Sequence, residues 1–443
     1  MIVALLCAAA VQIQDTTALT LMAAVDRALA GYPSVAVARA RAEGASADVG
    51  SAQAAWLPRL SLDGSVNRFQ EPMVVTPLHG FDPAHLPLFD RTLVQTGLSL
   101  NWTLIDFARP ARVRAQRALA GAADAALEGS EQQLVSRVAT GYLRVLTARD
   151  LVAAQDQRLA ALRASSDRTR QLMAEGKAAR INQLRVDAEV RRAEADRTGS
   201  VAQLDVAEHD LAQLTQLSYE AIHGAALVHL RLTDTTYAAD TSDALWAGLI
   251  AGARTASADL REARQRSRAA GAGVSAARAT WLPEVRVAGA YVDRGRWTGD
   301  FTAEWQVGAA LSYPLFAGGG RLAAVRRASA DERAAEAQLR AVELNVEQGV
   351  DQALAALRQA HARVAALQSA VEQSAEVARI EELSLEVGSG TQTDYLTAEA
   401  NLLASRAGLI EARHAEISAR IELARVTGEL SREWLAGIVE PAP

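Results

Sequence analysis

Residues 54–58 read Ala-Ala-Trp-Leu-Pro, and residues 279–283 read Ala-Thr-Trp-Leu-Pro. The chain of 443 residues holds only 7 tryptophans and 11 prolines, so the return of both in one short stretch indicates an internal repeat. Each copy is predicted to contain a helix, the Trp-Leu-Pro bend, two strands, a very long helix, a glycine turn and a second helix. Two further matches keep the same order: residues 97–102 match 308–313, and residues 175–184 match 387–396.

The repeat divides the chain into an expected order of segments. The apolar stretch at the start is predicted to be a signal peptide, and Cys7, the single cysteine, leaves lipid attachment as an alternative. The expected segments are a signal peptide at 1–10, the first copy at 11–225, a linker at 226–240, the second copy at 241–430 and a tail at 431–443.

Four segments of about ten residues alternate between apolar and polar side chains. In the first of them, Leu60, Leu62 and Val66 fall on one face, while Ser61 and Asp63 fall on the other. This length suits a tilted strand that crosses a bilayer. A half-exposed soluble sheet shows the same alternation, but the chain supplies no conventional layer to cover one. The predicted strands span about 59–69, 93–104, 284–292 and 302–315.

Four strands cannot close a membrane barrel by themselves. Open strand edges in lipid would leave backbone groups unpaired, at a cost of several kcal/mol each. The edges must therefore pair with other copies of the chain. Because a barrel of eight strands fills its own interior, a channel needs three copies or more.

Long helices are expected after each pair of strands, because no proline lies between Pro110 and Pro283 or between Pro314 and Pro441. The pattern from about 109 to 173 would give a helix on the order of 100 Å long. Apolar residues recur every seven positions, which predicts coiled-coil packing. The two rows are Val138, Val145, Val152 and Leu159, and Val350, Leu357, Val364 and Val371.

Composition and motifs exclude several classes of protein. The net charge is −6 and no basic block occurs, which argues against nucleic-acid binding. No uninterrupted apolar run is long enough for a membrane-spanning helix. The seven histidines are scattered, and His79 with His85 offer too few ligands for a metal site. We therefore expect no catalytic residue, no cofactor and no metal.

These residues resemble those of the TolC-like outer-membrane efflux proteins over nearly the whole chain. The motifs that carry the resemblance are Leu19-Thr20-Leu21, Tyr32-Pro33, Trp56-Leu57-Pro58, Tyr313-Pro314-Leu315-Phe316, Gly318-Gly319-Gly320-Arg321 and Asp394-Tyr395-Leu396. The resemblance implies an α+β fold: a homotrimeric outer-membrane β-barrel, four strands per protomer and twelve in all, continued by an α-helical coiled-coil tunnel through the periplasm. It also implies contact with outer-membrane lipid, a periplasmic adaptor protein and an inner-membrane pump.

The resemblance implies two functional regions at the far end of the tunnel. The glycine turns would form the tip that meets the adaptor, through Gly176, Lys177, Gly388, Ser389, Gly390 and Thr391. A constriction ring would include Asp394, with Thr391 and Tyr395 as candidates to support its carboxylate. Relatives often carry a second acidic residue where this chain has Thr397, and Asn182 stands in the first copy where Asp394 stands in the second. We therefore expect a less negative constriction.

The function implied is a passive exit duct of a tripartite system that exports small molecules such as drugs or metabolites, and not an enzyme. An exit duct for type I protein secretion or heavy-metal efflux is the alternative within this class. A soluble coiled-coil scaffold is the alternative from another class. The substrate is not encoded in any motif that the sequence displays.

Overall fold

The computed structural model describes residues 18–74, 88–89, 91–233 and 242–441. The expected signal peptide, Cys7, His79 and His85 lie outside these residues. The chain divides into two compact units, each described by itself below. They are the sheet unit, Arg39–Ala126 with Arg261–Val342, and the helical unit, Met1–Ala38 with Leu127–Leu260 and Glu343–Pro443.

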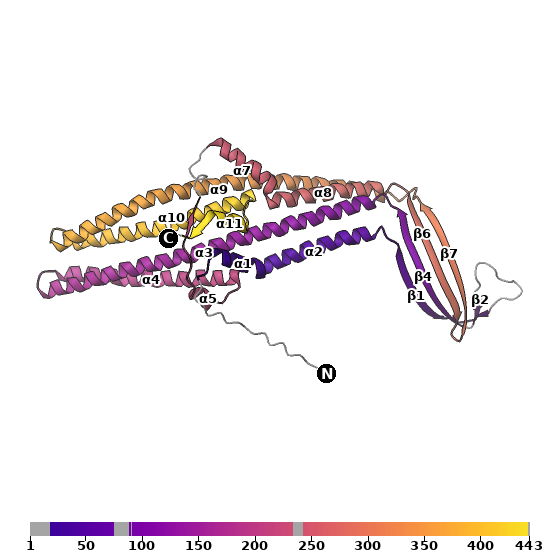
Figure 1. Cartoon of the computed structure of the whole chain (residues 1–443), viewed down its shortest axis with the longest axis horizontal. Coiled ribbons are helices and arrows are strands. Elements are labelled where there is room, and N and C mark those ends of the chain that lie inside the picture. Colours follow the sequence, from indigo (N-terminus) through magenta and orange to yellow (C-terminus); the bar gives the residue numbers. More distant parts are fainter. Residues whose placement is uncertain (1–17, 75–87, 90, 234–241, 442–443) are drawn as a thin grey trace. The chain divides into compact units, whose positions relative to one another are not determined.

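A four-stranded antiparallel sheet lies in the sheet unit (Figure 1), in the order β1-β4-β6-β7. Residues opposite one another share a face, and Leu62 faces Leu98, which in turn faces Tyr291 of the third strand. Apolar side chains therefore line up across the sheet, as the alternation predicts. The strands are β1 (Arg59–Arg68), β4 (Thr92–Ile105), β6 (Glu284–Arg296) and β7 (Gly299–Ser312).

The last hairpin differs from the prediction. The sequence suggested a strand ending near 292 and another starting near 302, but Arg296 of β6 already pairs with Gly299 of β7. Gly299 has a φ of +122°, which L side chains rarely adopt, and this conformation lets the chain reverse over two residues. At its other end β7 stops at Ser312, two residues ahead of Pro314 and short of the predicted 315.

The long helices expected from the proline-free stretches are present. Within the described residues, none of the helices combines the length and the apolar character that a bilayer crossing requires. The four longest are α3 (Arg109–Ala174), α4 (Arg180–Thr215), α9 (Gly320–Glu386) and α10 (Gln392–Thr427). The shorter ones are α1 (Leu21–Gly31), α2 (Pro33–Ala54), α5 (Tyr219–His223), α7 (Asp243–Ala256), α8 (Ala258–Ala279) and α11 (Arg432–Ile438).

Two further strand pairs join segments outside the main sheet. The backbones of β2 (Met73–Val74) and β3 (Leu88–Phe89) pair within the segment that separates β1 from β4. In the helical unit, β5 (Leu230–Leu232) pairs with β8 (Val439–Pro441). The segment between the two repeats is thus hydrogen-bonded to the C-terminal segment, a pairing that no pattern in the sequence predicts.

The internal repeat is visible in side-chain packing. The Arg109 guanidinium lies over the Trp56 ring at 4.9 Å, and the Arg321 guanidinium lies over the Trp281 ring at 5.6 Å. Such cation–π contacts hold the start of each long helix to the bend ahead of the strands. This arrangement explains why the Trp-Leu-Pro motif occurs in both copies.

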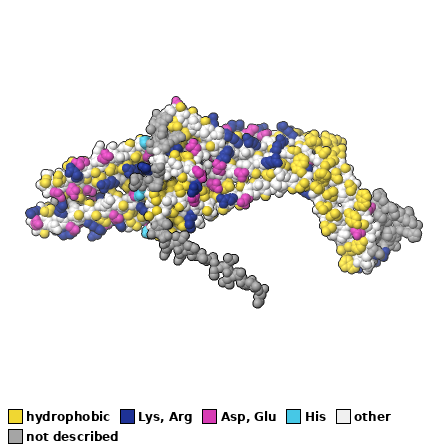
Figure 2. Space-filling view, viewed as in Figure 1, with side chains coloured by type: hydrophobic (Ala, Val, Ile, Leu, Met, Phe, Trp, Pro, Cys, Tyr) yellow, Lys and Arg dark blue, Asp and Glu magenta, His cyan; other side chains and the backbone are white. Residues whose placement is uncertain are grey.

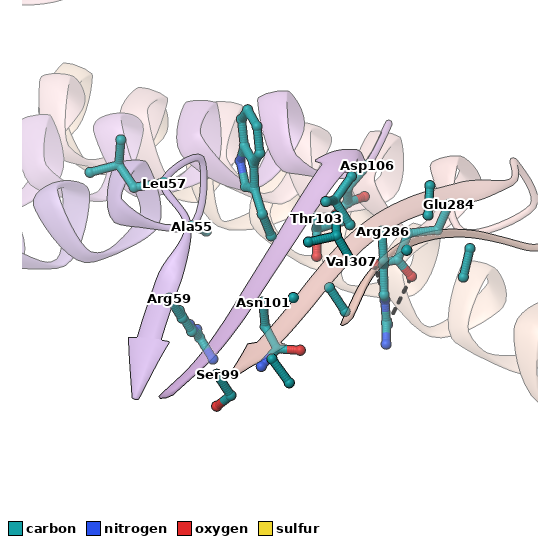
Figure 3. A pocket seen from close by; sticks show the side chains of 18 of the residues that line it. Ala55, Leu57, Arg59, Ser99, Asn101, Thr103, Asp106, Glu284, Arg286 and Val307 are labelled. Carbon is teal, nitrogen blue, oxygen red and sulfur yellow. Dashed lines mark hydrogen bonds and ion pairs between the residues drawn. The ribbon is translucent and has the colours of Figure 1, made fainter. Parts of the chain in front are cut away.

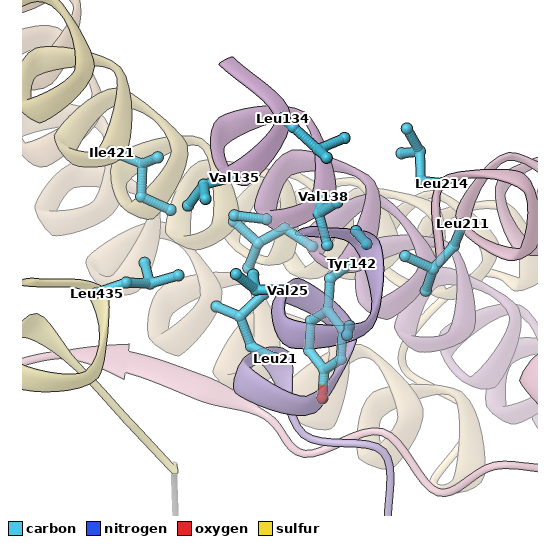
Figure 4. Packing of buried hydrophobic residues seen from close by; sticks show 14 of the residues in the cluster. Leu21, Val25, Leu134, Val135, Val138, Tyr142, Leu211, Leu214, Ile421 and Leu435 are labelled. Carbon is cyan, nitrogen blue, oxygen red and sulfur yellow. The ribbon is translucent and has the colours of Figure 1, made fainter. Parts of the chain in front are cut away.

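The core of the helical unit gathers side chains from α1, α3, α4, α10 and α11 (Figure 4). Tyr142 is fully buried in it, and its hydroxyl donates its one proton to the Leu19 carbonyl oxygen at 2.7 Å, with the Val228 carbonyl oxygen 3.0 Å away. The same hydroxyl accepts the Val228 N–H at 2.7 Å. One tyrosine therefore ties the N-terminal and inter-repeat segments to α3.

The heptad rows are buried only along part of their length. Val138, Val145, Val350 and Leu357 are buried in the helical unit. Val152, Val364 and Val371 are half-buried in the single chain, whereas Leu159, at the end of the first row, is buried again. The rows therefore leave apolar surface that one chain does not cover by itself.

Candidate functional site

One face of the sheet is apolar and exposed. Leu62 is 80% exposed, Trp305 is 73% exposed and Leu311 is 70% exposed. Figure 2 shows hydrophobic side chains gathered over the strands. A contiguous apolar surface of this kind marks contact with a membrane or another protein. Further exposed side chains of this face are Leu60, Val66, Leu98, Tyr291 and Val307.

The opposite face of the sheet is polar. The hydroxyls of Ser61 and Ser99 lie 2.7 Å apart, and Ser99 also donates to Asp63 at 3.3 Å. Arg286 donates to both carboxylate oxygens of Glu284, at 2.9 and 3.0 Å, so these two charges compensate. A cavity of about 850 Å³ runs along this face (Figure 3), and its lining includes Arg59, Asn101, Thr103, Asp106 and Gly308.

A sheet that is apolar on one side and polar on the other has the make-up of a channel wall between lipid and water. Its polar side offers hydrogen-bonding groups and compensated charges to a passing solute. This arrangement can admit hydrated solutes, and no step of covalent chemistry is needed for that.

The two helix hairpins of the helical unit end in equivalent glycine turns. Gly176 has a φ of +73° and Gly388 a φ of +78°. After each glycine, an N–H bonds the carbonyl five residues earlier: Lys177 to Leu172 at 2.8 Å, and Ser389 to Ser384 at 2.9 Å. This Schellman arrangement needs a residue with positive φ, which explains the glycine in both copies.

Three polar contacts join the hairpins beside these turns. Arg168 pairs with Glu386 at 2.7 Å, across from α3 to α9. Gln392 donates to the Ser165 hydroxyl at 3.2 Å, and Arg185 donates to the Thr393 hydroxyl at 3.0 Å. A cavity of about 620 Å³ lies between the hairpins, and Arg168, Asn182, Glu386, Gly388 and Tyr395 are among its lining residues.

Two side chains of the inter-hairpin region have raised pKa values. Burial, together with the nearby Glu399 and Glu382, raises the pKa of the Tyr395 hydroxyl to about 12, against the opposing effect of Arg168. Burial and Glu382 also raise the pKa of Glu399. Burial is the larger cause for both groups, so the raised pKa values show that this region disfavours negative charge on Tyr395 and Glu399.

Asp394 lies exposed in the first turn of α10 and takes part in a helix cap. The Thr391 hydroxyl donates to the Asp394 carboxylate at 2.6 Å and accepts the Asp394 N–H at 3.2 Å. Thr391 therefore supports the carboxylate as expected. Tyr395, the other expected support, is instead buried and lines the cavity between the hairpins.

The remaining predicted residues fall into two groups. Lys177, Asn182, Gly388 and Gly390 line the inter-hairpin cavity together. Thr397 is exposed and donates to the Thr393 carbonyl at 2.8 Å, apart from that lining. Gly176 and Ser389 are exposed within their turns. The single chain thus brings Asn182 to the cavity but leaves Asp394 on the surface.

Two features escaped the sequence reasoning. The Arg168–Glu386 ion pair joins helices far apart in the chain, and arginines and glutamates are too frequent here to single out one pair. The histidines, treated as scattered, are not all isolated: His229 and His414 meet Asp150 in the helical unit. No fixed spacing in the sequence could have revealed that meeting, because it depends on the fold.

Comparisons with known proteins agree with this architecture. The family profile described as "Outer membrane efflux protein" matches residues 24–216 and 249–429, one block for each copy of the repeat. The outer membrane efflux protein BepC of Brucella suis is 25% identical over 351 residues, which cover 78% of this chain and 74% of the relative.

Solved structures share the fold. The outer membrane protein VceC of Vibrio cholerae is 21% identical with a TM-score of 0.77, covering 92% of this chain and 96% of that one. The outer membrane channel CmeC of Campylobacter jejuni is 15% identical with a TM-score of 0.78, covering 94% and 88%. With the family profile matched over most of its length, the chain belongs to the outer membrane efflux protein family and is a TolC-like channel protein of the outer membrane with a periplasmic extension, not an enzyme or a soluble scaffold.

Proposed function

We propose that three copies of this chain close one channel and that it serves as the exit duct of a tripartite efflux system for small molecules. The observation that carries the proposal is the sheet itself. Its order leaves β1 and β7 as edges, and its apolar face is exposed across all four strands. In lipid both edges need partners. Three sheets joined edge to edge supply them and enclose the polar faces around one lumen.

The pairing that closes the ring is β1 of one protomer with β7 of the next. Within the sheet β1 and β7 run in opposite directions, since three successive antiparallel pairings separate them. Neighbouring copies related by rotation would therefore meet as an antiparallel pair, which continues the pattern of the sheet. On the polar face, Ser61 of β1 and Gln306, Gly308 and Ala310 of β7 would lie near the junction.

Disulfide cross-linking tests this closure. In a Cys7→Ala background, Ser61→Cys is combined in turn with Gln306→Cys, Gly308→Cys and Ala310→Cys. One of these pairs should give covalent dimers and trimers after mild oxidation in membranes, because cross-strand partners approach within disulfide range. Ser61→Cys combined with Leu311→Cys is the matched control, since Leu311 belongs to the apolar face. Cross-linking in the control alone, or in none of the pairs, would contradict the closure.

For the helical unit, we propose that Asp394 and Thr397 of three protomers face a common constriction and that Asn182 adds an uncharged group. The residues of the two glycine turns would contact a periplasmic adaptor protein that links the duct to an inner-membrane pump. These residues are Gly176, Lys177, Gly388, Ser389, Gly390 and Thr391. The support for this is their shared location at the ends of the two hairpins and the crowding of acidic groups nearby.

The proposed cargo is a small molecule such as a drug or metabolite. The support is the similarity to BepC, an outer membrane efflux protein. Deletion of the gene in its host should increase sensitivity to several unrelated small toxic compounds, and expression of the intact chain should restore resistance. Unchanged sensitivity, with loss of a secreted protein or of metal tolerance instead, would favour the protein-secretion or heavy-metal alternative.

A further inference from the structure

Three side chains that can ligate a metal meet in the helical unit, although they come from distant parts of the chain. Asp150 lies on α3, His414 lies on α10, and His229 lies in the segment between α5 and β5. One ligand atom of each lies within 4.8 Å of the other two. The distance from His229 Nε2 to Asp150 Oδ1 is 3.7 Å, which is too long for a hydrogen bond. Two ligands around a tetrahedral zinc ion lie about 3.3 Å apart, so small side-chain rotations would suffice.

The hydrogen bonds of His414 leave its second ring nitrogen with a lone pair. The Thr147 hydroxyl donates its one proton to the Leu143 carbonyl at 2.9 Å. The same hydroxyl lies 2.7 Å from His414 Nδ1, so it accepts a proton from that nitrogen. The lone pair of the neutral ring is then on Nε2. A histidine that ligates a metal usually donates its other N–H in this way, which fixes the ring and the tautomer.

The surroundings favour a neutral imidazole next to a carboxylate. His414 is only 9% exposed and Asp150 is half-buried, so burial disfavours a charge on either side chain. A bound cation would offset the cost of keeping this half-buried carboxylate charged.

A second cluster, of Asp205, Glu208 and His223, is less suited to a metal. Glu208 is buried and already accepts hydrogen bonds from Arg149 at 2.6 and 3.1 Å. Its other oxygen lies 2.6 Å from His223 Nδ1. The arginine supplies the positive charge that a metal would bring, and would repel one. This cluster is an ion-pair network that holds α5 against α4.

We propose that Asp150, His229 and His414 bind one divalent transition-metal ion of the zinc class. Two imidazoles with one carboxylate suit zinc, nickel, cobalt or copper better than magnesium or calcium, which prefer oxygen ligands throughout. The ion would fasten the inter-repeat segment to α3 and α10. That segment also bonds the N-terminal region, where the Leu19 N–H donates to the Ala226 carbonyl at 2.9 Å. The site thus joins three parts of the helical unit, independently of the export proposal.

Cobalt is a suitable probe because its absorption reports nitrogen and oxygen ligation. The full-length protein is purified in detergent, stripped with a chelator and titrated with Co²⁺, and bound Co²⁺ is then displaced with Zn²⁺. The wild-type protein should bind one ion per chain. His229→Gln, at an exposed position, should lower the affinity by about tenfold or more. Thr147→Val, which removes only the partner of His414 Nδ1, should lower it by about 10- to 100-fold.

Matched variants separate this site from adventitious histidine binding. His361→Gln removes a histidine whose partner is Glu416, outside the cluster, and should leave Co²⁺ binding unchanged. His223→Gln tests the second cluster and should also leave it unchanged. Zn²⁺ should raise the melting temperature of the wild-type protein but not of His229→Gln. The proposal fails if the wild type binds no ion, if His229→Gln retains full affinity, or if the control variants lose binding equally.

Discussion

Replacing Tyr142 by phenylalanine removes one oxygen atom from the core of the helical unit. That oxygen accepts the Val228 N–H at 2.7 Å and bonds the Leu19 carbonyl at 2.7 Å. In Tyr142→Phe both backbone groups lose their partner, while the ring still fills the site. An unpaired buried polar group costs about 1–3 kcal/mol, and two half-buried groups together give an expected loss of about 2–4 kcal/mol.

Hydrogen exchange of the Val228 amide measures this loss locally. A change of about 2–4 kcal/mol corresponds to exchange about 30- to 700-fold faster if the segment opens locally. The melting temperature should fall by several degrees. Tyr32→Phe is the control, because the Tyr32 hydroxyl only accepts a long contact of 3.5 Å from Arg137 at an exposed position. If Val228 exchanges no faster in Tyr142→Phe than in the control, the hydroxyl does not pin the inter-repeat segment to α3.

The other predictions concern pH, a helix end and the constriction. Burial raises the pKa of the Tyr142 hydroxyl to about 12, against about 10 in an unfolded chain. The stabilisation contributed by the protonated hydroxyl is therefore fully present below pH 10, and the free energy of unfolding should fall by about 2–3 kcal/mol as the pH rises through 12. In Tyr142→Phe this fall should be less steep. Gly428→Ala should destabilise the chain by more than about 2 kcal/mol in urea unfolding, because Gly428 has a φ of +81° and an added Cβ would lie 2.5 Å from the Ala256 backbone. Gln216 is the matching left-handed cap of α4, and Gln216→Gly should instead be neutral or stabilising. In planar bilayers Asp394→Asn should weaken cation selectivity and divalent-cation block, while its side chain still offers Thr391 an acceptor. Asn182→Ala should change selectivity and block less. Equal effects of the two variants would show that the constriction does not lie at Asp394.

Much of the fold follows from local patterns in the sequence. Alternation over residues such as Leu60 and Leu62 depends only on the period of a strand, and the absence of proline permits helices of 66 and 67 residues. The glycine turns were recognisable because a positive φ, as at Gly176 and Gly388, favours one residue type. These signals are local, so one sequence suffices to see them.

The contacts that position functional groups were harder to foresee, because they join residues far apart in the chain. The cap between Thr391 and Asp394 is a short-range pattern and was partly anticipated. By contrast, the burial of Tyr395 depends on how α10 packs against the other hairpin. The pairing of β5 with β8 likewise depends on the whole helical unit, since each strand has only three residues and no distinctive pattern.

The mass of the particle extracted from outer membranes tests the central claim most directly. Native mass spectrometry in detergent should show one dominant species of three copies of the 47.0 kDa chain, less any segment removed at the N-terminus. Three copies are expected because the free edges of β1 and β7 must pair around a lumen. A stable monomer or dimer that keeps its native fold would contradict the closed twelve-stranded channel.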